Sequence, residues 1–390
     1  MARILFHTDA IKQPLTGIGR YTRELGAALA NAREGGVDVL CRPVPPDAAL
    51  PGGPIVPDTL RRALRAVPGA YGLLHQRSAR RLRAIVQRET PDLYHEPNFV
   101  LRPFDGPTVL TCHDLAHVRH PEQQPTQRRR FLDAHLPRSL DRADRIIVPS
   151  RFVRDELAAT CPIDPGKLRV VPEGVAPRFR PHTAEEVAPA LSRFGLSRGG
   201  YLLSVGTLEP RKNLAALAAA FAELPGDLRR RYPLVIAGTP GWRHGAMDRC
   251  LAGLAREGTA RILGHVPDVA LPALYGGAAA FAYLSVYEGF GLPVLEALAS
   301  GVPVLAADTP SLVEVADGAA VHVAPGDPSR VGAELTRLLT DRALRQTLAM
   351  DGPRRAAVLT WANAAAWTRA VYAELVPDAG APPETAGRPA

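Results

Sequence analysis

The stretch Phe281-Ala-Tyr-Leu-Ser-Val-Tyr-Glu-Gly-Phe-Gly-Leu-Pro-Val-Leu-Glu296 decides the fold of this chain of 390 residues. It begins with apolar and small residues that predict a buried strand, and its proline is typical of the first turn of a helix. Gly289 and Gly291 let a ligand approach the backbone, and the free amides of a helix start attract an anion. Glu288 lies on the turn, and Glu296 lies about one turn inside the helix, where it can accept hydrogen bonds from ribose hydroxyls. The stretch therefore predicts a nucleotide-sugar site; the alternative is an ordinary turn with two solvated acids.

A second stretch, Ser204-Val-Gly-Thr-Leu-Glu-Pro-Arg-Lys-Asn213, links a predicted strand to a predicted helix. Arg211 offers a planar fork of donors and Lys212 a compact charge, so together they can neutralise a diphosphate. The alternative is a pair of exposed cations, but cations near a helix start oppose the helix dipole unless an anion bridges them. The pair therefore predicts an anion site.

These two stretches resemble the E-x7-E signature and the diphosphate loop of the retaining glycosyltransferases of family 4, also described as glycosyl transferases group 1. The resemblance extends from the first strand to the region of Trp361. It implies an α/β chain with the GT-B fold, in which two Rossmann-like domains turn their parallel sheets toward a central cleft.

The alternation of strand and helix patterns in both halves also favours parallel sheets covered by helices. The predicted strands are Arg3–Thr8, Leu93–His95, Thr108–Cys112, Arg145–Val148, Leu168–Pro172, Tyr201–Gly206, Leu234–Ala237, Arg261–Gly264, Ala279–Leu284, Pro303–Ala306 and Ala320–Val323. Long helices are expected at Gly19–Ala30, Leu214–Leu224, Arg330–Leu348 and Pro353–Leu375. The expected domains are 1–177 for the acceptor, 178–200 as a linker, 201–355 for the nucleotide sugar, 356–376 as a helix crossing back to the first domain, and 377–390 as a disordered tail.

The resemblance implies roles for individual residues. Arg211 and Lys212 would hold the donor phosphates and stabilise the charge that grows as the glycosidic bond breaks. Glu296 would bind the ribose, Glu288 would lie near the transferred sugar, and the backbone at His265-Val266 would read the base. The donor-binding set is Gly17, Gly19, Gly206, Thr207, Arg211, Lys212, His265, Val266, Glu288, Gly289, Phe290, Gly291, Leu292 and Glu296, and the catalytic set is His113, Glu288, Arg211 and Lys212. In this family the donor phosphate itself is thought to lie on the acceptor's side, so positioning contributes more than proton transfer by side chains.

The first half carries the remaining candidates. Gly17-Ile-Gly-Arg-Tyr21 fails as a dinucleotide fingerprint because its third glycine position is Thr22, but it resembles the family's flexible glycine-rich loop; the alternative is a helix-capping loop. His113 follows a strand and, by the resemblance, contacts the donor sugar or an acceptor hydroxyl; a lone histidine is otherwise more often structural. The expected acceptor-binding residues are Asp9, His95, Asn98 and Asp114.

One position departs from the family. Glu173, in Val171-Pro-Glu-Gly-Val175, stands where many relatives have Asn before the glycine. Its expected effect is on the chemistry of a turn near the hinge rather than on catalysis.

The net charge of +8 is concentrated in the first half, where eight arginines lie between Asp58 and Glu89 without an acid. Such a field favours an anionic membrane surface or lipid phosphate over nucleic acid, for which no motif is present. Arg77, Arg80, Arg81 and Arg88, with Leu82, Ile85 and Val86, predict a basic amphipathic helix; the alternative is a solvated arginine-rich face. Four cysteines without metal or redox spacing and no visible signal peptide indicate a cytoplasmic chain, or one bound peripherally to the inner face of a membrane.

The predicted function is transfer of a sugar, with retention, from a nucleotide diphosphate donor to a glycan, a lipid-linked or a small-molecule acceptor. GDP-mannose is the first candidate donor because Gly17–Tyr21 resembles bacterial mannosyltransferases. No metal or cofactor is expected, since the chain has no Asp-x-Asp clamp. The alternatives are other GT-B chemistry, such as a nucleotide-sugar epimerase or a phosphorylase, and a sugar- or nucleotide-binding protein without turnover.

Overall fold

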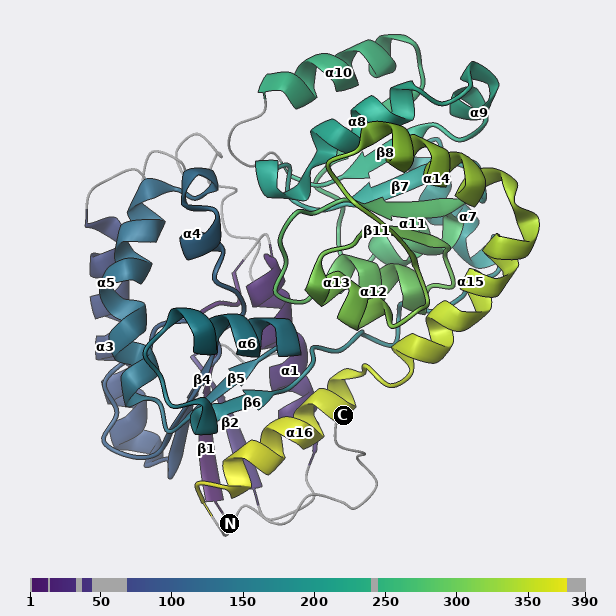
Figure 1. The fold of residues 1–390 in the computed structure, drawn as a ribbon. Coiled ribbons are helices and arrows are strands. Elements are labelled where there is room, and N and C mark those ends of the chain that lie inside the picture. The colour runs from purple at the N-terminus through teal and green to yellow at the C-terminus, as the bar shows by residue number, and fades with distance from the viewer. Residues whose placement is uncertain (1, 13–14, 33–36, 44–68, 240–244, 377–390) are drawn as a thin grey trace. The chain divides into compact units, whose positions relative to one another are not determined.

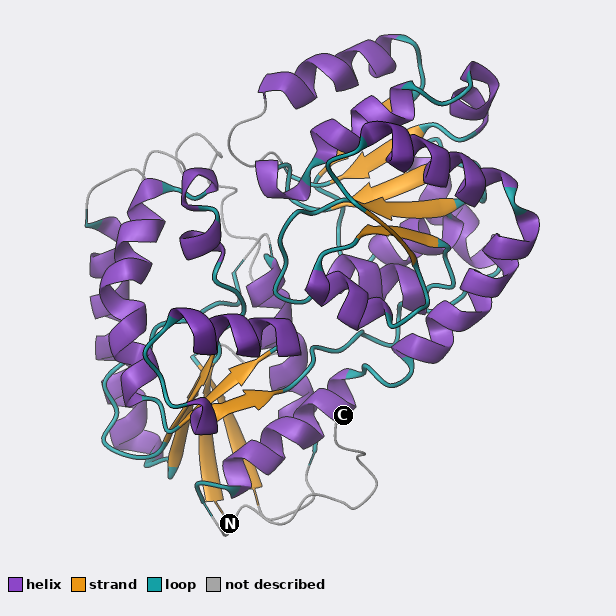
Figure 2. Cartoon of the chain, in the orientation of Figure 1, coloured by secondary structure: helices purple, strands orange, loops and turns teal. Residues whose placement is uncertain are grey.

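The structure, a computed structural model, describes residues 2–12, 15–32, 37–43, 69–239 and 245–376. It divides into two compact units, one of residues 1–174 and 361–390 and the other of residues 175–360. Each unit contains a parallel sheet with helices packed on it (Figure 2). The tail expected at 377–390 lies outside the described residues.

The sheet of unit 1 has the strand order β2-β1-β3-β4-β5-β6. Its strands are β1 (Ala2–His7), β2 (Val37–Arg42), β3 (Leu93–Glu96), β4 (Thr108–Thr111), β5 (Arg145–Val148) and β6 (Leu168–Val170). The helices are α1 (Gly17–Asn31), α3 (Ala70–Glu89), α4 (Ala116–Arg119), α5 (Thr126–Arg142), α6 (Arg151–Thr160) and α16 (Trp361–Ala373), with short 3-10 turns at Pro121–Gln123 and Pro165–Lys167. Strands such as β4 are buried along their whole length, as expected of a parallel sheet covered on both faces.

The sheet of unit 2 has the order β12-β11-β10-β7-β8-β9. Its strands are β7 (Leu202–Val205), β8 (Leu234–Ala237), β9 (Ala260–Gly264), β10 (Ala280–Tyr283), β11 (Val304–Ala307) and β12 (Val321–Val323). The helices are α7 (Ala184–Arg193), α8 (Leu214–Ala222), α9 (Gly226–Arg231), α10 (Gly245–Arg256), α11 (Leu271–Gly277), α12 (Leu292–Ala299), α13 (Pro310–Ala316), α14 (Pro328–Thr340) and α15 (Arg342–Ala356), and η3 (Pro210–Lys212) is a 3-10 turn. A core of Leu, Ala, Phe and Val side chains lies between β7, β8, β10 and helices α8, α10 and α14.

Each of the two parallel sheets has a carboxyl edge, where its strands end, and ligands of such folds commonly bind at this edge. In each sheet the chain adds strands on one side of its first strand and then reverses, at β1/β3 in unit 1 and at β7/β10 in unit 2. Loops that leave two neighbouring strands in opposite directions open a crevice at such a point. The loops that follow these four strands are therefore the candidate binding loops.

The strand predictions agree with the structure within a residue or two, but β2 was not predicted. The helix predictions at 330–348 and 353–375 were wrong in their division: α14 ends at Thr340, and α15 runs through Pro353 to Ala356. Asp341 causes the break, because its side chain accepts a hydrogen bond from the Leu344 amide (3.0 Å) and so caps a new helix.

Residues 178–200, expected to be a linker, contain α7 and belong to unit 2. Thr183 and Glu186 form a capping box at the start of this helix, and α7 packs on α11. The last helix, α16, is grouped with unit 1 and packs on α1 (yellow and dark purple in Figure 1).

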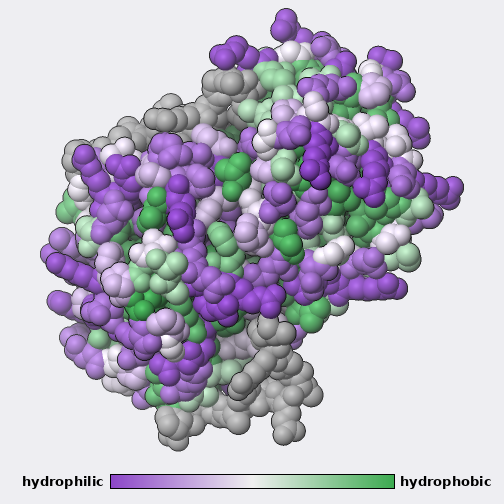
Figure 3. All heavy atoms as spheres, in the orientation of Figure 1, coloured by the Kyte–Doolittle hydropathy of each residue, from purple (hydrophilic) through white to green (hydrophobic). Residues whose placement is uncertain are grey.

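Hydrophilic side chains cover most of the visible face of each unit (Figure 3). Within the residues that the structure describes, no helix combines the length and the apolar character needed to cross a membrane.

Candidate active site

The cation turn η3 follows β7, the strand on one side of the switch point in unit 2. Its backbone is tied to the loop after β10, because the Arg211 carbonyl accepts hydrogen bonds from the Val286 amide (3.0 Å) and the Ser285 hydroxyl (3.1 Å). Asn213 ends the turn with a φ of 52°, a left-handed conformation that asparagine tolerates better than most residues. The two loops at the switch point therefore form one connected structure.

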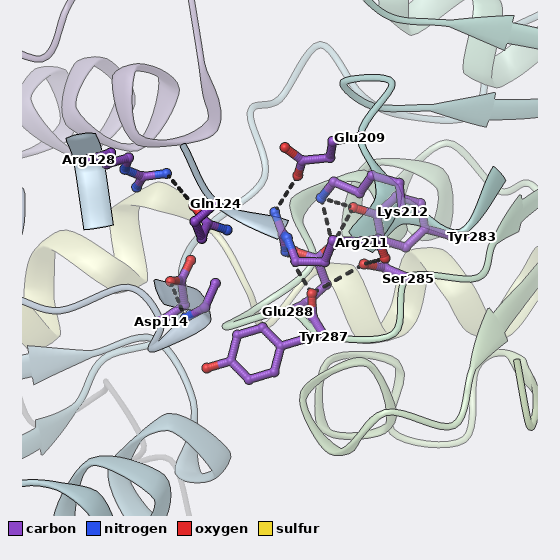
Figure 4. A network of polar contacts seen from close by, with 11 residues as sticks. Asp114, Gln124, Arg128, Glu209, Arg211, Lys212, Tyr283, Ser285, Tyr287 and Glu288 are labelled. Carbon is purple, nitrogen blue, oxygen red and sulfur yellow. Dashed lines mark hydrogen bonds and ion pairs between the residues drawn. The ribbon is translucent and has the colours of Figure 1, made fainter. Parts of the chain in front are cut away.

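Arg211 and Lys212 converge on the Glu288 carboxylate (Figure 4). Arg211 Nη1 donates to one carboxylate oxygen at 2.8 Å, and Lys212 Nζ donates to the other at 2.6 Å. The Tyr283 hydroxyl donates to the same oxygen as Lys212, at 2.8 Å. On its other side, Arg211 Nη2 donates to Glu209 at 2.8 Å. The sequence predicted the cation pair, and the structure adds that two acids neutralise it.

The Glu288 carboxyl is buried but ionised. Burial raises its pKa, yet the positive charges of Arg211 and Lys212 outweigh burial and hold the pKa at about 2, down from 4.5. The same carboxylate, together with burial, raises the pKa of Tyr283 well above its ordinary value, so this phenol stays protonated as a donor. The group is a compact electrostatic site in which two cations share the Glu288 carboxylate, and Arg211 also pairs with Glu209.

The start of α12 is the second part of this site. Gly291 is its N-cap residue, with a φ of 113°, and an added Cβ there would lie 2.4 Å from a methyl group of Leu312. Only glycine fits such a position without strain. The Ser311 hydroxyl donates to the Glu288 carbonyl at 2.6 Å and so fixes the preceding turn. The turn and the helix start predicted from the sequence are confirmed.

The other predicted donor residues of unit 2 surround these two parts. Gly206 lies beside Lys212 and Tyr283, since an added Cβ would lie 3.8 Å from each side chain. Glu296 lies inside α12 and is buried, and so are Gly289, Phe290 and Leu292. Thr207 is exposed, while His265 and Val266 follow β9 with the histidine exposed and the valine buried.

His113 is the predicted catalytic residue of unit 1, two residues beyond the end of β4. It is buried, and its ring is held at both nitrogens: Nδ1 lies 3.3 Å from Glu173 Oε1, and Nε2 lies 2.9 Å from the Pro97 carbonyl. Gly17 and Gly19 form the first turn of α1 instead of a loop before it, because the Thr16 side chain caps the helix by accepting from the Gly19 amide.

The predicted acceptor residues have unequal access to solvent. His95 is fully buried. Both of its ring nitrogens are hydrogen-bonded: Nδ1 to the Tyr372 hydroxyl at 2.6 Å, and Nε2 to the Thr111 hydroxyl at 2.8 Å. In this arrangement His95 supports the unit and offers no surface to an acceptor. Asp9, Asn98 and Asp114 are partly exposed at the carboxyl edge of the sheet, although the Asp114 side chain accepts a hydrogen bond from the Ala116 amide at the start of α4.

Sequence reasoning missed five polar residues at these sites. Tyr283 lies in an apolar strand pattern, which does not indicate that its hydroxyl contacts Glu288. Glu209 could have been found, because an acid two positions before Arg211 is a natural ion-pair partner for it. Glu96 and Arg102 form a buried ion pair at the β1/β3 switch point of unit 1, and His7 adds a 3.0 Å contact to the same carboxylate. No cluster of His, Cys, Asp and Glu suited to a metal ion occurs among the residues described.

Comparison with known proteins agrees with the geometry. The family model described as Glycosyltransferase Family 4 matches residues 15–179, and that described as Glycosyl transferases group 1 matches residues 196–355. The O-antigen chain mannosyltransferase B of Escherichia coli is 36% identical over 381 residues, which are 95% of this chain and 99% of that protein. A D-inositol 3-phosphate glycosyltransferase of Nocardiopsis dassonvillei is 32% identical, covering 93% of this chain and 91% of its own length.

Solved structures share the fold. Sucrose-phosphate synthase of Thermosynechococcus elongatus matches with a TM-score of 0.71 at 22% identity, over 96% of this chain and 99% of that one. WaaG, a glycosyltransferase of lipopolysaccharide biosynthesis, matches with a TM-score of 0.69 at 16% identity, over 96% of this chain and all of its own. Two matching family models, a relative similar over nearly its whole length and the two parallel sheets together show that this chain belongs to glycosyltransferase family 4, the retaining glycosyltransferases with the GT-B fold.

Proposed function

We propose that this protein transfers mannose, with retention of configuration, from a nucleoside diphosphate mannose to a growing surface polysaccharide. The observation that carries the proposal is the 36% identity, over 95% of the chain, to a relative named an O-antigen chain mannosyltransferase. Further relatives at 28–29% identity are also named mannosyltransferases, although the match spans only about a third of their length. GDP-mannose remains the first candidate donor.

The cation turn suits the departure of a diphosphate. In the transfer, the bond between the sugar C1 and a phosphate oxygen breaks, a bond from C1 to the acceptor oxygen forms, and the acceptor proton moves to the departing phosphate. Arg211 and Lys212 supply three or more hydrogen-bond donors with fixed positive charge at the switch point, and such preorganised charge is worth most where it develops during the reaction. Glu288 then has two roles. In the free protein it orients Arg211 and Lys212, and when the donor binds, the diphosphate replaces it as their partner.

The experiment is a transfer assay with GDP-mannose, UDP-glucose and UDP-N-acetylglucosamine, each offered with a lipid-linked glycan acceptor. Mannose transfer from GDP-mannose alone is the expected result. Arg211→Ala and Lys212→Ala should each abolish transfer and the thermal stabilisation by GDP, which reports binding to the folded protein. Arg342→Gln, an exposed change in α15, is the control. Transfer only from a UDP-sugar would refute the donor, and undiminished GDP binding by both variants would refute the anion site.

A surface of α3 fits an anionic membrane that presents a lipid-linked acceptor. The outward residues Leu73, Leu74, Arg77, Arg80 and Arg81 fall on one side of the helix at 100° per residue. Leu73 and Leu74 are about 60% exposed, and the three arginines are exposed as well. Leu82, Ile85 and Val86, the apolar residues of the predicted amphipathic helix, pack on the core of unit 1 and do not belong to this outward surface.

Vesicle sedimentation tests this surface. The protein should bind vesicles with phosphatidylglycerol and not vesicles of phosphatidylcholine alone. Because each cation near such a surface contributes about 1 kcal/mol, the triple change Arg77→Gln, Arg80→Gln and Arg81→Gln should weaken binding roughly a hundredfold. Arg342→Gln again serves as the control. Equal binding by the triple variant would exclude α3 as the docking surface.

A further inference from the structure

Glu173, the residue that departs from the family pattern, lies against the ring of His113. Its carboxylate oxygen Oε1 is 3.3 Å from Nδ1, and both side chains are about 8% exposed. No other hydrogen bond of the Glu173 side chain occurs among the described residues. The substitution at this turn therefore brings a buried acid to the residue that the family resemblance makes essential.

The two neighbours of the ring decide where its hydrogens lie. The Pro97 carbonyl, 2.9 Å from Nε2, can only accept a hydrogen bond, so Nε2 carries a hydrogen. On the other side, Nδ1 faces a carboxylate oxygen, and two bare acceptors cannot bond to each other. A hydrogen must therefore lie between His113 and Glu173. Because a glutamic acid side chain is ordinarily about two pKa units more acidic than an imidazolium, we place this hydrogen on the ring, which makes the pair an imidazolium beside a carboxylate.

The surroundings favour this pairing of charges. The Tyr21 ring meets the His113 ring edge-on at 4.6 Å between centroids, and Phe99 lies at 5.8 Å. These aromatic rings cover part of the His113 ring, and in such low-polarity surroundings the attraction between opposite charges is stronger than in water. The second imidazole nearby does not compete for the charge, because burial lowers the pKa of His95 to about 3 and keeps it neutral.

We propose that Glu173 is a positioning residue that holds His113 as a doubly protonated, cationic hydrogen-bond donor. An imidazolium with both nitrogens donating cannot take a proton from an acceptor hydroxyl, so His113 is not a general base. It acts instead as a fixed positive charge at the carboxyl edge of the unit 1 sheet, where it favours negative charge that develops on a substrate bound at this edge. The catalytic half of this proposal rests on the proposed function, whereas the protonation of the ring does not.

Two measurements test the proposal. In protein labelled with ¹⁵N-histidine, the His113 signals, assigned by their loss in His113→Gln, should show hydrogen on both ring nitrogens. Glu173→Gln should leave Nδ1 bare, because the amide can donate to it. In transfer assays the same variant should lower kcat by roughly tenfold or more, the effect of losing a charge-assisted hydrogen bond, with the donor KM changed less than about threefold.

The controls separate positioning from folding. Glu173→Asp, which keeps the charge, should recover part of kcat, and Glu173→Gln should cost nothing further in a His113→Gln background. Glu156→Gln, which alters another buried acid of unit 1 paired with Arg119, should change neither readout.

One bare nitrogen on His113 in the unaltered protein would overturn the proposal, as would unchanged kcat in Glu173→Gln. A protein that transfers no mannose still gives the ¹⁵N result, so failure of the proposed function is distinguished from failure of this inference.

Discussion

Replacing Glu288 by Gln should tighten the binding of GDP while destabilising the free protein. In the free protein the carboxylate occupies both cations, at 2.8 Å from Arg211 Nη1 and 2.6 Å from Lys212 Nζ. Its pKa falls from 4.5 to about 2, and each pKa unit corresponds to about 1.36 kcal/mol, so the net interaction amounts to about 3 kcal/mol. A diphosphate must displace this carboxylate or bind beside its negative charge. Either way the charge opposes binding, and even half of that energy is worth about tenfold in affinity.

Isothermal titration with GDP measures the affinity, and urea unfolding measures the stability. Glu288→Gln should bind GDP at least tenfold more tightly and should lose about 3 kcal/mol of unfolding free energy without ligand. The GDP-induced stabilisation should therefore exceed that of the unaltered protein. Glu156→Gln removes a buried acid that pairs with the half-exposed Arg119, remote in sequence from the cation turn, and it should leave the affinity unchanged. Equal or weaker GDP binding by a folded Glu288→Gln would refute the exchange of carboxylate for phosphate.

Three further outcomes are expected. Gly291→Ala should lower the unfolding free energy by about 1–3 kcal/mol, because a Cβ at a φ of 113° would meet Leu312, whereas Gly72→Ala, in open space on α3, should not destabilise in the same urea titration. The stabilisation by Glu288 is complete above pH 4.5 and is lost as the pH falls toward 2; acid titrations of unfolding should therefore show the unaltered protein and Glu288→Gln converging over that range, and a constant difference would contradict the depressed pKa. Tyr283→Phe should weaken GDP binding by about 1 kcal/mol, because Lys212 loses the hydroxyl that orients it at 2.7 Å; unchanged affinity in titration calorimetry would remove Tyr283 from the site.

The fold was largely predictable because its strands are short apolar runs separated by helix starts and turn residues. Such signals are local: Ser150, for instance, caps α6 by accepting from the Val153 amide (3.2 Å), and serine is a common residue at this position. The elements that were predicted wrongly or not at all depend on contacts between residues far apart in the sequence. Strand β2 alternates buried and partly exposed residues, and it joins the sheet by pairing with β1. Pro353 lies inside α15, where local reasoning placed a helix start.

The candidate site was predictable as a set of cations, glycines and acids but not as a network. Lys212 and Arg211 stand out by their type and position, and Gly291 by the geometry that a turn demands. That Glu288 neutralises the cations depends on the reversal of strand order between β7 and β10, which no local pattern reveals. Glu173 shows the same limit: its type was noted as unusual, but its contact with His113 spans 60 residues of sequence.

The return of α16 to the first unit has a consequence for biosynthesis. Tyr372, on this helix, is fully buried and bonds to His95, while Glu374 pairs with Arg145 and Arg169. On a translating ribosome, unit 2 can therefore complete its fold before the unit that was begun first, because unit 1 lacks a helix that packs on α1 until α16 emerges. A premature stop codon just after Thr360 would spare every strand yet leave the earliest-made half without its closing helix, and such a product is a natural substrate for chaperones and proteases.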